Sequence, residues 1–565
     1  MLKRWVLLFP WLFLWLACQV PLPASFPLPR FSPWGGEPFA VERAPTLPPG
    51  GDSCCQVRLH PEERLYIGDQ VSFEVIAPSK QPYLNQPLTV TLTTPPALIG
   101  STTFQPYGFD RRTQATLLWA WDTRTLLAGE YTLNFSIPGL KKQWRQTVTL
   151  LPRSTMPLEE QTARWQTLSV DCCEVHFITN TAAHRQIEEI AEVVEREYRV
   201  AQAQIPVSPE ERLSVVLIPR VLGNGGFANA EVNVSFLDRN YTAGDFATIL
   251  RHEIVHVLDG QARPDPRPSL FVEGIAVYLS EGHYFPEALS PRAAELVRLQ
   301  KYVPLRELAT NFYEHQHEIA YLEAGALVEY LARRWGWGKA WETYLEMSLR
   351  EGESQLAAIE RALKTQLGLS LQELERDFLA DLAATPQSND LSWNLLTMER
   401  YYEVLRAYQR QLDPSAYYRT AWMLDGRQMR QKGVVADYFR HPRRTENLVL
   451  ELLLNETGRA QRAGDYVLAE RRVQAVERVL NRLEQGLPAP FAADPIAEDA
   501  WEVVQVLLAA GYEPQTWSLD GQRAQVRATR GASHLIEIVL EKQSGTWQIR
   551  SRTSAAGEDL IYRAE

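Results

Sequence analysis

Apolar and polar positions alternate in short runs over residues 55–152, with turn residues between the runs. Polar and apolar residues alternate one by one along residues 70–75, 88–92 and 131–135. A period of two residues is typical of strands that are buried on one face only. The pattern therefore predicts a β-sandwich over residues 53–153, and such a module usually serves as a spacer or a binding platform.

The next part of the chain combines buried strands with amphipathic helices. Residues 175–179 and 213–218 are apolar runs of strand length, and residues 186–200 between them have a helical period. Residues 227–236 alternate like a further strand, and helical periodicity dominates from there to about residue 385. We expect one α+β domain over residues 165–385, with a sheet beneath a layer of helices.

The last third of the chain changes period once more. Residues 390–490 are predicted to be helical, most clearly at 401–412 and 469–483. Residues 512–551 have the pattern of four short strands. A small α+β module is therefore predicted over residues 495–565, and ligand or partner binding is its default interpretation.

Two helices with clear start and stop signals lie in the middle of the chain. The first covers residues 246–259, with Asp245 or Thr242 as N-cap and Gly260 as C-cap. The second begins at Pro268-Ser269 and ends near Gly282. Both helices carry side chains that are able to bind metal.

The first helix contains the pattern His-Glu-x-x-His at His252, Glu253 and His256. The two histidines lie about 40° apart on a helix, so both rings project from one face, as two ligands of one ion must. Glu253 lies about 100° from His252, where a general base takes a proton from water without becoming a ligand. With 10 His and 69 acids in the chain, roughly 0.02 matches are expected by chance.

Glu273 is the predicted third ligand, because it lies within the apolar run 270–278. A buried carboxylate is costly unless it is paired, and zinc held by two histidines is a suitable partner. An ordinary glutamate on a half-exposed helix is the alternative interpretation. Glu281 and Asp259 are further candidates: Glu281 is near a helix end, and Asp259 would orient a ligand, contact substrate or cap the helix. The sequence thus predicts one Zn²⁺ per chain, bound by His252, His256 and Glu273.

These motifs resemble those of the gluzincin zinc peptidases, specifically the peptidase MA-like group. The resemblance rests on residues 252–256, on residues 271–278 and on the helical pattern at 321–331, and it covers about residues 165–385. It implies that His252, His256 and Glu273 bind zinc and that Glu253 is the base. For residues 165–385 the resemblance implies an α+β thermolysin-like zinc peptidase domain. With the patterns of the other segments, the expected fold class is a multidomain mixed α/β chain that also has an N-terminal immunoglobulin-like β-sandwich, a helical region and a small C-terminal α+β module.

Two positions depart from that family. Its aminopeptidases carry a Gly-x-Met-Glu-Asn stretch whose Glu holds the substrate amine, whereas the best match here, at 225–229, has Ala228 in that place. Val277 stands four residues after Glu273, where thermolysin-like enzymes have an acid that steadies a histidine. The first departure favours endopeptidase action or an unusual substrate, and the second implies different or weaker support for the ligands.

A donor for the oxyanion of the tetrahedral intermediate is also needed. In many gluzincins a Tyr or His from a later helix serves, and Tyr321 is the first choice because it opens the pattern at 321–331 and small residues follow it. Tyr313, His315 and His317 are rivals. For each of these residues, simple packing in the core is an equally good interpretation.

Length and charge limit the possible functions. At 565 residues the chain is too long for one core, so several domains are expected. The formal net charge of −11 disfavours nucleic acid as a partner. The sequence leaves the oligomeric state open.

The N-terminus is predicted to be a targeting segment. Lys3 and Arg4 precede an apolar stretch at 5–17, which is too short to span a membrane comfortably and suits a signal peptide. Cys18 follows a small residue and resembles the lipidated cysteine of a bacterial lipoprotein, although Trp15 stands where Leu is usual.

Residues 1–18 are therefore predicted to be a signal peptide of the lipoprotein type, and residues 19–52 a proline-rich tether. The expected location is the outer face of the cell membrane, held by a lipid anchor. The alternatives are a secreted protein cleaved near Ala24 and an uncleaved anchor.

Four further cysteines occur as two adjacent pairs, Cys54-Cys55 and Cys172-Cys173. An exported chain favours disulfides, and the pairs flank the predicted sandwich. We expect at least one bridge between the first pair and the second. Neighbouring residues of a strand face opposite ways, so two such bridges at once would strain the sheet.

The sequence predicts a zinc-dependent peptidase that hydrolyses a peptide or protein substrate with metal-activated water, as an endopeptidase at the outer cell surface. The alternative is a surface binding or scaffold lipoprotein with weak catalysis. The presence of Glu253 favours the enzyme, because a domain freed from catalysis has no evident need for a base at that position. The substrate itself is not identified by the sequence.

Overall fold

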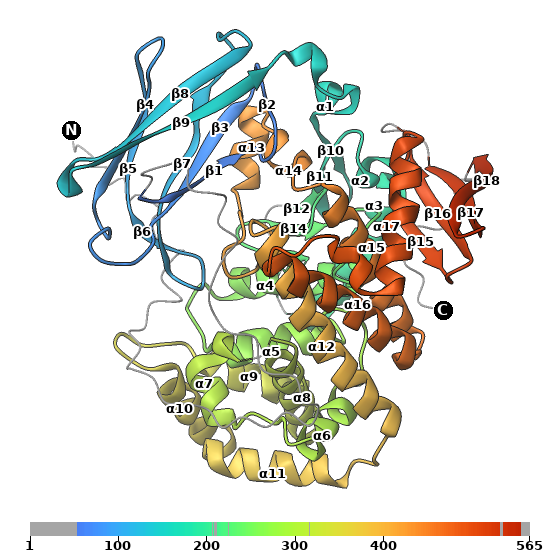
Figure 1. Ribbon diagram of the computed structural model, residues 1–565. Helices are drawn as coiled ribbons and strands as arrows, with labels where there is room; N and C mark the ends of the chain where they lie inside the picture. The colour runs from blue at the N-terminus through green and yellow to red at the C-terminus, as the bar shows by residue number, and fades with distance from the viewer. Residues whose placement is uncertain are drawn as a thin grey trace, which may run out of the picture.

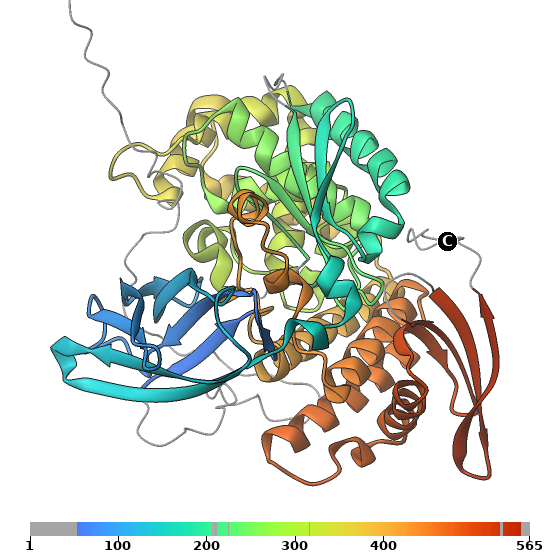
Figure 2. The same cartoon turned by 90° about the horizontal axis from the view of Figure 1, so that it is seen from above.

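The computed structural model shows a mixed α/β protein with several sheets and many helices, organised in more than one domain (Figure 1). This confirms the predicted class at that level. Figures 1 and 2 show the N-terminal strands and the C-terminal sheet at opposite ends of the molecule, with helices between them. The structure describes residues 54–205, 207, 212–223, 225–315, 317–530 and 535–554.

The predictions about the N-terminus lie outside the described residues. These are the signal peptide at 1–18, the lipidation of Cys18 and the tether at 19–52. In the part of the chain that the structure describes, no helix combines the length and the apolar character needed to cross a membrane.

Two sheets near the N-terminus enclose one apolar core. Phe73, Trp121 and Phe135 are buried between them, because alternate side chains of each strand point inward. One sheet has the order β1-β3-β7-β6 and the other β2-β9-β8-β4-β5. The strands are β1 Gln56–His60, β2 Leu65–Tyr66, β3 Gln70–Ile76, β4 Pro87–Leu92, β5 Ala97–Thr103, β6 Gln105–Tyr107, β7 Arg112–Asp122, β8 Gly129–Ile137 and β9 Lys142–Leu151.

A third sheet, of order β10-β11-β12-β14-β13, lies beneath the central helices. Its middle strands β11, β12 and β14 are parallel and consist mainly of buried aliphatic residues, as expected for a sheet covered by helices. The strands are β10 Trp165–Ser169, β11 Cys173–Ile178, β12 Leu213–Ile218, β13 Gly226–Ala228 and β14 Val232–Ser235. The connecting helices are α1 Leu158–Thr162, α2 Ala182–Arg185 and α3 Ile187–Gln204.

The prediction of a single strand at 227–236 is wrong. Asn229 N donates to Glu231 O (3.0 Å), and Asn229 Oδ1 accepts from Glu231 N (2.8 Å), so the chain reverses in a tight turn. The segment is instead a hairpin of β13 and β14. The reversal makes β13 the edge of the sheet.

The central helices pack closely where glycines face a neighbouring helix. A Cβ built on Gly274 would lie 2.7 Å from the carbonyl oxygen of Ala324, so α5 and α8 approach to backbone contact. On the facing helix, a Cβ on Gly325 would collide with Val277. The helices are α4 Phe246–Ala262, α5 Ser269–Leu279, α6 Leu289–Arg298, α7 Leu305–Asn311, η3 Phe312–Glu314, α8 His317–Trp335, α9 Trp337–Glu346, α10 Gln355–Leu367 and α11 Leu371–Ala384.

The C-terminal part is helical and ends in a four-stranded antiparallel sheet of order β15-β16-β17-β18. One apolar cluster extends from Cys173 to Trp547, so these helices share a core with the central sheet. The elements are α12 Asn389–Leu412, α13 Gly426–Lys432, α14 Ala436–Phe439, α15 Thr445–Arg462, α16 Tyr466–Glu484, α17 Pro495–Ala509, β15 Glu513–Leu519, β16 Arg523–Thr529, β17 Leu535–Gln543 and β18 Thr546–Ser554.

The predicted bridge between the two cysteine pairs is wrong. Cys172 and Cys173 form a disulfide with each other, whereas Cys54 and Cys55 are free thiols whose sulfurs are 3.0 Å apart. The physical reason is that the pairs belong to different cores. Cys55 packs in the N-terminal core and Cys173 in the core of the central sheet.

Candidate metal centre

Helix α4 positions both histidines of the motif. Its N-cap Asp245 accepts a hydrogen bond from Thr248 N (2.8 Å), which fixes the first turn. The predicted end at Gly260 is wrong, because the chain leaves the helix only at Arg263, an extended C-cap residue. The rings therefore project from a helix that is continuous on both sides of the motif.

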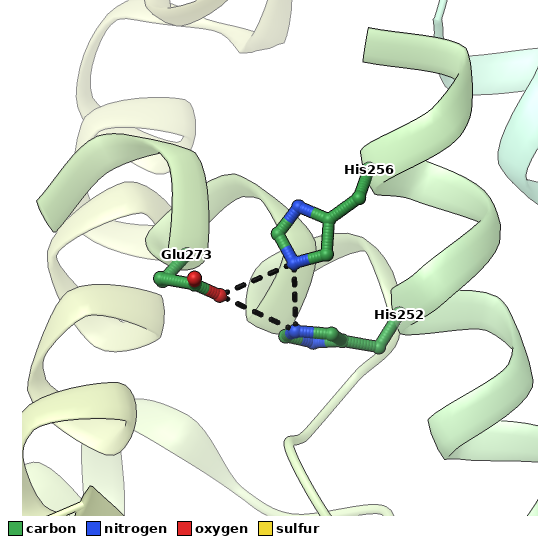
Figure 3. A group of neighbouring side chains, drawn as sticks. All are labelled: His252, His256 and Glu273. Atoms are coloured by element: carbon green, nitrogen blue, oxygen red, sulfur yellow. Dashed lines mark hydrogen bonds and ion pairs between the residues drawn. The ribbon is translucent and has the colours of Figure 1, made fainter. Parts of the chain in front are cut away.

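His252, His256 and Glu273 converge on one point (Figure 3). The two Nε2 atoms are 3.1 Å apart. Glu273 Oε2, which comes from α5, lies 3.4 Å from His252 Nε2 and 3.2 Å from His256 Nε2. His252 and Glu273 are buried, whereas the side chain of His256 keeps 18% of its surface exposed. The group is thus shielded on one side and open to solvent at His256.

The spacing and chemistry of the triad fit zinc. Tetrahedral ligands about 2.0–2.1 Å from the ion lie about 3.3–3.4 Å from one another, and the observed separations are 3.1, 3.2 and 3.4 Å. The buried Glu273 Oε2 faces both imidazoles and has no other hydrogen-bond partner among the described residues, so a cation between the three groups would compensate the burial of this carboxylate. Two imidazoles and one carboxylate are the protein ligands of many catalytic zinc sites, where a fourth position stays open.

The charges within the triad depend on one another. Burial alone would raise the pKa of Glu273, but His256 and His252 hold that pKa well below its usual value. Burial opposes the charging of His256, yet the facing Glu273 raises its pKa to about 9. Burial lowers the pKa of His252. The pocket therefore favours one added positive charge, which a proton or a metal ion supplies.

Glu253 lies beside the triad and against strand β13. A Cβ built on Gly226 would lie 2.9 Å from Glu253 Oε1, so only glycine leaves room for this carboxyl. Burial raises the pKa of Glu253 to about 8, while His256 opposes that rise and Glu273 adds to it. A carboxyl whose pKa is raised in this way holds a proton more readily than an exposed glutamate, which suits a group that accepts and returns a proton.

Two tyrosines reach the site in different ways. Tyr313 donates a hydrogen bond to Glu273 Oε1 (2.7 Å). Tyr321 is buried, with its ring centroid 6.2 Å from that of His252. Burial raises the pKa of Tyr321 well above its usual value, so its hydroxyl keeps its proton at neutral pH. Helix α8 begins at His317 rather than at Tyr321, and the role of Tyr321 as oxyanion donor stays a prediction.

His283 belongs to the site although the sequence did not single it out. Its ring centroid lies 5.1 Å from that of His252 and 4.0 Å from that of Tyr321, and His317 stacks on Tyr321 at 4.1 Å. His283 Nδ1 is buried without a hydrogen-bond partner in the described part of the chain. In the sequence His283 is a single histidine far from the His-Glu-x-x-His motif, and no helical period connects the two. The rival His315 lies in the turn before α8.

The other candidate ligands are engaged elsewhere. Asp259 accepts a hydrogen bond from Arg267 Nη2 (3.0 Å) and another from Tyr344 OH, so it ties the end of α4 to its neighbours. The side chain of Glu281 is 74% exposed. No acid at Val277 steadies a histidine here: His252 Nδ1 is buried without a hydrogen-bond partner among the described residues. Tyr313 supports the carboxylate Glu273 instead.

Comparisons with known proteins do not establish the function of this chain. No protein-family model and no curated protein matches the chain. Among solved structures, the chain is similar to an aminopeptidase N family protein from Idiomarina loihiensis, with 12% identity and a TM-score of 0.26. The match covers 58% of this chain and 77% of that one. At this TM-score the likeness decides neither fold nor function.

Proposed function

We propose that this protein is a zinc-dependent peptidase of the gluzincin type that cleaves peptide bonds within a chain. The observation that carries the proposal is the convergence of His252, His256 and Glu273, with the carboxyl of Glu253 beside them. A purely structural zinc site has four protein ligands and needs no acid next to them. Three ligands with an adjacent buried acid suit hydrolysis instead.

Each residue has its own task in this proposal. His252, His256 and Glu273 would hold Zn²⁺, whose Lewis acidity lowers the pKa of water and polarises a carbonyl oxygen. Glu253 takes a proton from the attacking water and passes it to the leaving amine. Tyr321 is proposed to donate a hydrogen bond to the oxyanion.

Strand β13 supports a peptide as the substrate. It is the edge of its sheet, and an extended peptide is able to pair with such an edge. Ala228 on this strand offers no carboxylate for a free amine. The nearby Glu231 is engaged by Ser214 (2.9 Å) and Arg430. Endopeptidase action therefore fits this strand better than N-terminal trimming.

The finer organisation of the chain is part of the proposal. Residues 53–153 are assigned to an immunoglobulin-like sandwich, 165–385 to a thermolysin-like peptidase domain, 390–490 to a helical region and 495–565 to an α+β module. The shared core of the two N-terminal sheets supports the first assignment. Lipidation at Cys18 would hold the enzyme at the outer face of the membrane.

Zinc content and cleavage of a mixed peptide library test the proposal. We expect natively purified protein to hold about one zinc per chain, and cleavage to stop with a chelator and return with zinc. Glu253→Gln is expected to keep the metal but lower kcat/KM about 10²–10⁴-fold. The matched control is Glu281→Gln, whose side chain is exposed. Parental rates in Glu253→Gln, or a protein that refuses zinc, would exclude this function, and zinc without cleavage would favour a scaffold.

A further inference from the structure

We propose that the β6–β7 hairpin of the N-terminal sandwich forms a hydrophobic substrate subsite beside the metal centre. Phe109 at its tip is the specificity-determining residue, and its partner is an apolar side chain of the peptide near the scissile bond. The inference rests on the proposed peptidase function, because it deepens the account of the same site.

The tip of this hairpin is fixed to a loop that precedes α13. Phe109 N donates to Arg419 O (2.9 Å), and Tyr107 OH donates to Ala421 O (3.0 Å). Gly108 has φ +65°, and a Cβ built on it would overlap the carbonyl oxygen of Arg419. Backbone contact on this scale holds the tip in one place, as a binding element requires.

Phe109 points its ring at the support of a metal ligand. Its ring centroid lies 5.3 Å from that of Tyr313, and Tyr313 OH donates to Glu273 Oε1 (2.7 Å). The side chain of Phe109 nevertheless remains 50% exposed. An aromatic ring that is held this firmly and left half uncovered offers an apolar surface within two side chains of the metal ligands.

A second path connects the same loop to the buried rings of the site. Arg419 donates to Tyr418 OH (2.7 Å) and to Asp110 Oδ1 (3.0 Å). The ring of Tyr418 lies 5.4 Å from that of His317, which stacks on Tyr321. The hairpin and the loop thus form one wall that contacts the side chains around the metal ligands at two places, Tyr313 and His317.

The chemistry of this wall favours an uncharged, apolar side chain. Phe109 and Tyr313 present aromatic surface, and the neighbouring charge of Arg419 is already paired with Asp110. A leucine or phenylalanine of the substrate would bury its surface against the rings, whereas a charged side chain would lose hydration without gaining a partner. A polar small side chain would gain little from either ring.

Cleavage and binding of matched peptides test the inference separately. The peptides differ at one position next to the scissile bond, carrying Leu or Ser. In Phe109→Ala, we expect the ratio of kcat/KM for Leu over Ser to fall roughly ten-fold or more, while Phe109→Leu retains most of the ratio. Leu98→Ala is the control, because Leu98 is also exposed (68%) but lies on β5 of the same sandwich.

Binding of the labelled peptides to zinc-loaded Glu253→Gln, measured by fluorescence anisotropy, gives a readout that does not need turnover. We expect Phe109→Ala in that background to weaken Leu peptides and leave Ser peptides within about two-fold. Equal effects on both peptides, no effect, or no binding of either peptide would overturn the subsite. If the parent protein cleaves nothing but Phe109→Ala loses the Leu preference in binding, the subsite stands and the peptidase proposal fails.

Discussion

At the scale of single residues, Glu273 has a different partner for each of its oxygens. Oε2 faces the two imidazoles, and Oε1 accepts the hydrogen bond from Tyr313. A hydrogen bond to a ligating carboxylate fixes its orientation and so preserves the geometry that the ion needs. In the proposed zinc site, Tyr313 is therefore a positioning residue for the ligand Glu273.

Replacing Tyr313 by Phe removes that hydrogen bond and leaves the ring in place. We expect the dissociation constant for Zn²⁺ to rise about 10- to 100-fold, measured by competition with a chelating dye. The matched control is Tyr302→Phe, because Tyr302 OH also donates to a carboxylate, Glu375 Oε1 (3.0 Å), and lies outside the metal-ligating group. Equal zinc affinity in both variants would contradict the positioning role.

The sequence predicted that the two histidines come together because their spacing has a fixed geometric meaning, whereas Glu273 was predicted from its apolar surroundings. His252 and His256 are four positions apart on one helix, so local structure alone puts their rings on one face. Tyr313 and His283 lie in short or irregular segments. Their approach to the site depends on how α5 and α8 pack, which no local period specifies.

At the scale of elements, the distance between α5 and α8 decides where Glu273 lies. Gly274 follows Glu273 directly and faces the backbone of α8 at Ala324. Its absent side chain lets the two helices approach closely, and the backbone of the preceding residue Glu273 is fixed by the same contact. Helix packing and ligand position are therefore linked at one glycine.

Gly274→Ala tests this link, because the new Cβ would lie 2.7 Å from the carbonyl oxygen of Ala324. The backbone carbonyl of Ala324 cannot move aside as a flexible side chain does. We therefore expect a loss of about 1–3 kcal/mol in the free energy of unfolding and weaker zinc binding. Gly260→Ala in α4 is the control. Its Cβ would meet nothing within 4 Å, so a gain of about 0.5–1 kcal/mol is expected. Urea denaturation of both variants measures the difference, and a neutral Gly274→Ala would show that the helices are free to separate.

The boundaries of elements were harder to predict than their existence. The helix at 246–259 extends to Ala262, because the intrinsic preference of Gly260 for a helix end is overruled by the continuing backbone bonds. The expected strand at 227–236 is two strands, because the side chain of Asn229 stabilises a turn inside an otherwise alternating pattern. In both places the hydrophobic period continues through the boundary and does not mark it.

At the scale of the whole molecule, the question is how the sandwich is held against the rest. Polar contacts supply part of the attachment. The sequence did not predict them, because their partners are hundreds of positions apart. Trp119 Nε1 on β7 donates to Asp437 Oδ2 (2.7 Å). The cysteine pairs do not contribute, since each pair lies within its own core. The placement of the hairpin tip beside Tyr313 depends on this attachment.

Arg440 makes the most extensive of these contacts and offers the test of the attachment. Its Nη1 and Nη2 donate to the two oxygens of Asp69 (2.7 and 2.9 Å), and its Nε donates to Glu160 Oε2 (2.6 Å). Both Arg440 and Asp69 are buried. Arg440→Ala would leave the carboxylate of Asp69 without its charge partner, so we expect a loss of about 3–5 kcal/mol.

Calorimetry and limited proteolysis should report that loss as a lower unfolding temperature and faster cleavage between residues 152 and 164, where the sandwich joins the central sheet. The control is Arg124→Ala, which also removes an arginine that pairs with an aspartate of the sandwich, Asp122, but at an exposed position. No measurable change is expected there, because water replaces the partner of an exposed ion pair. If Arg440→Ala resisted protease as the parent does, apolar packing such as that of Trp119 with Trp422 and Tyr438 would be sufficient to hold the sandwich. The hairpin at the metal centre would then be positioned without the buried ion pair.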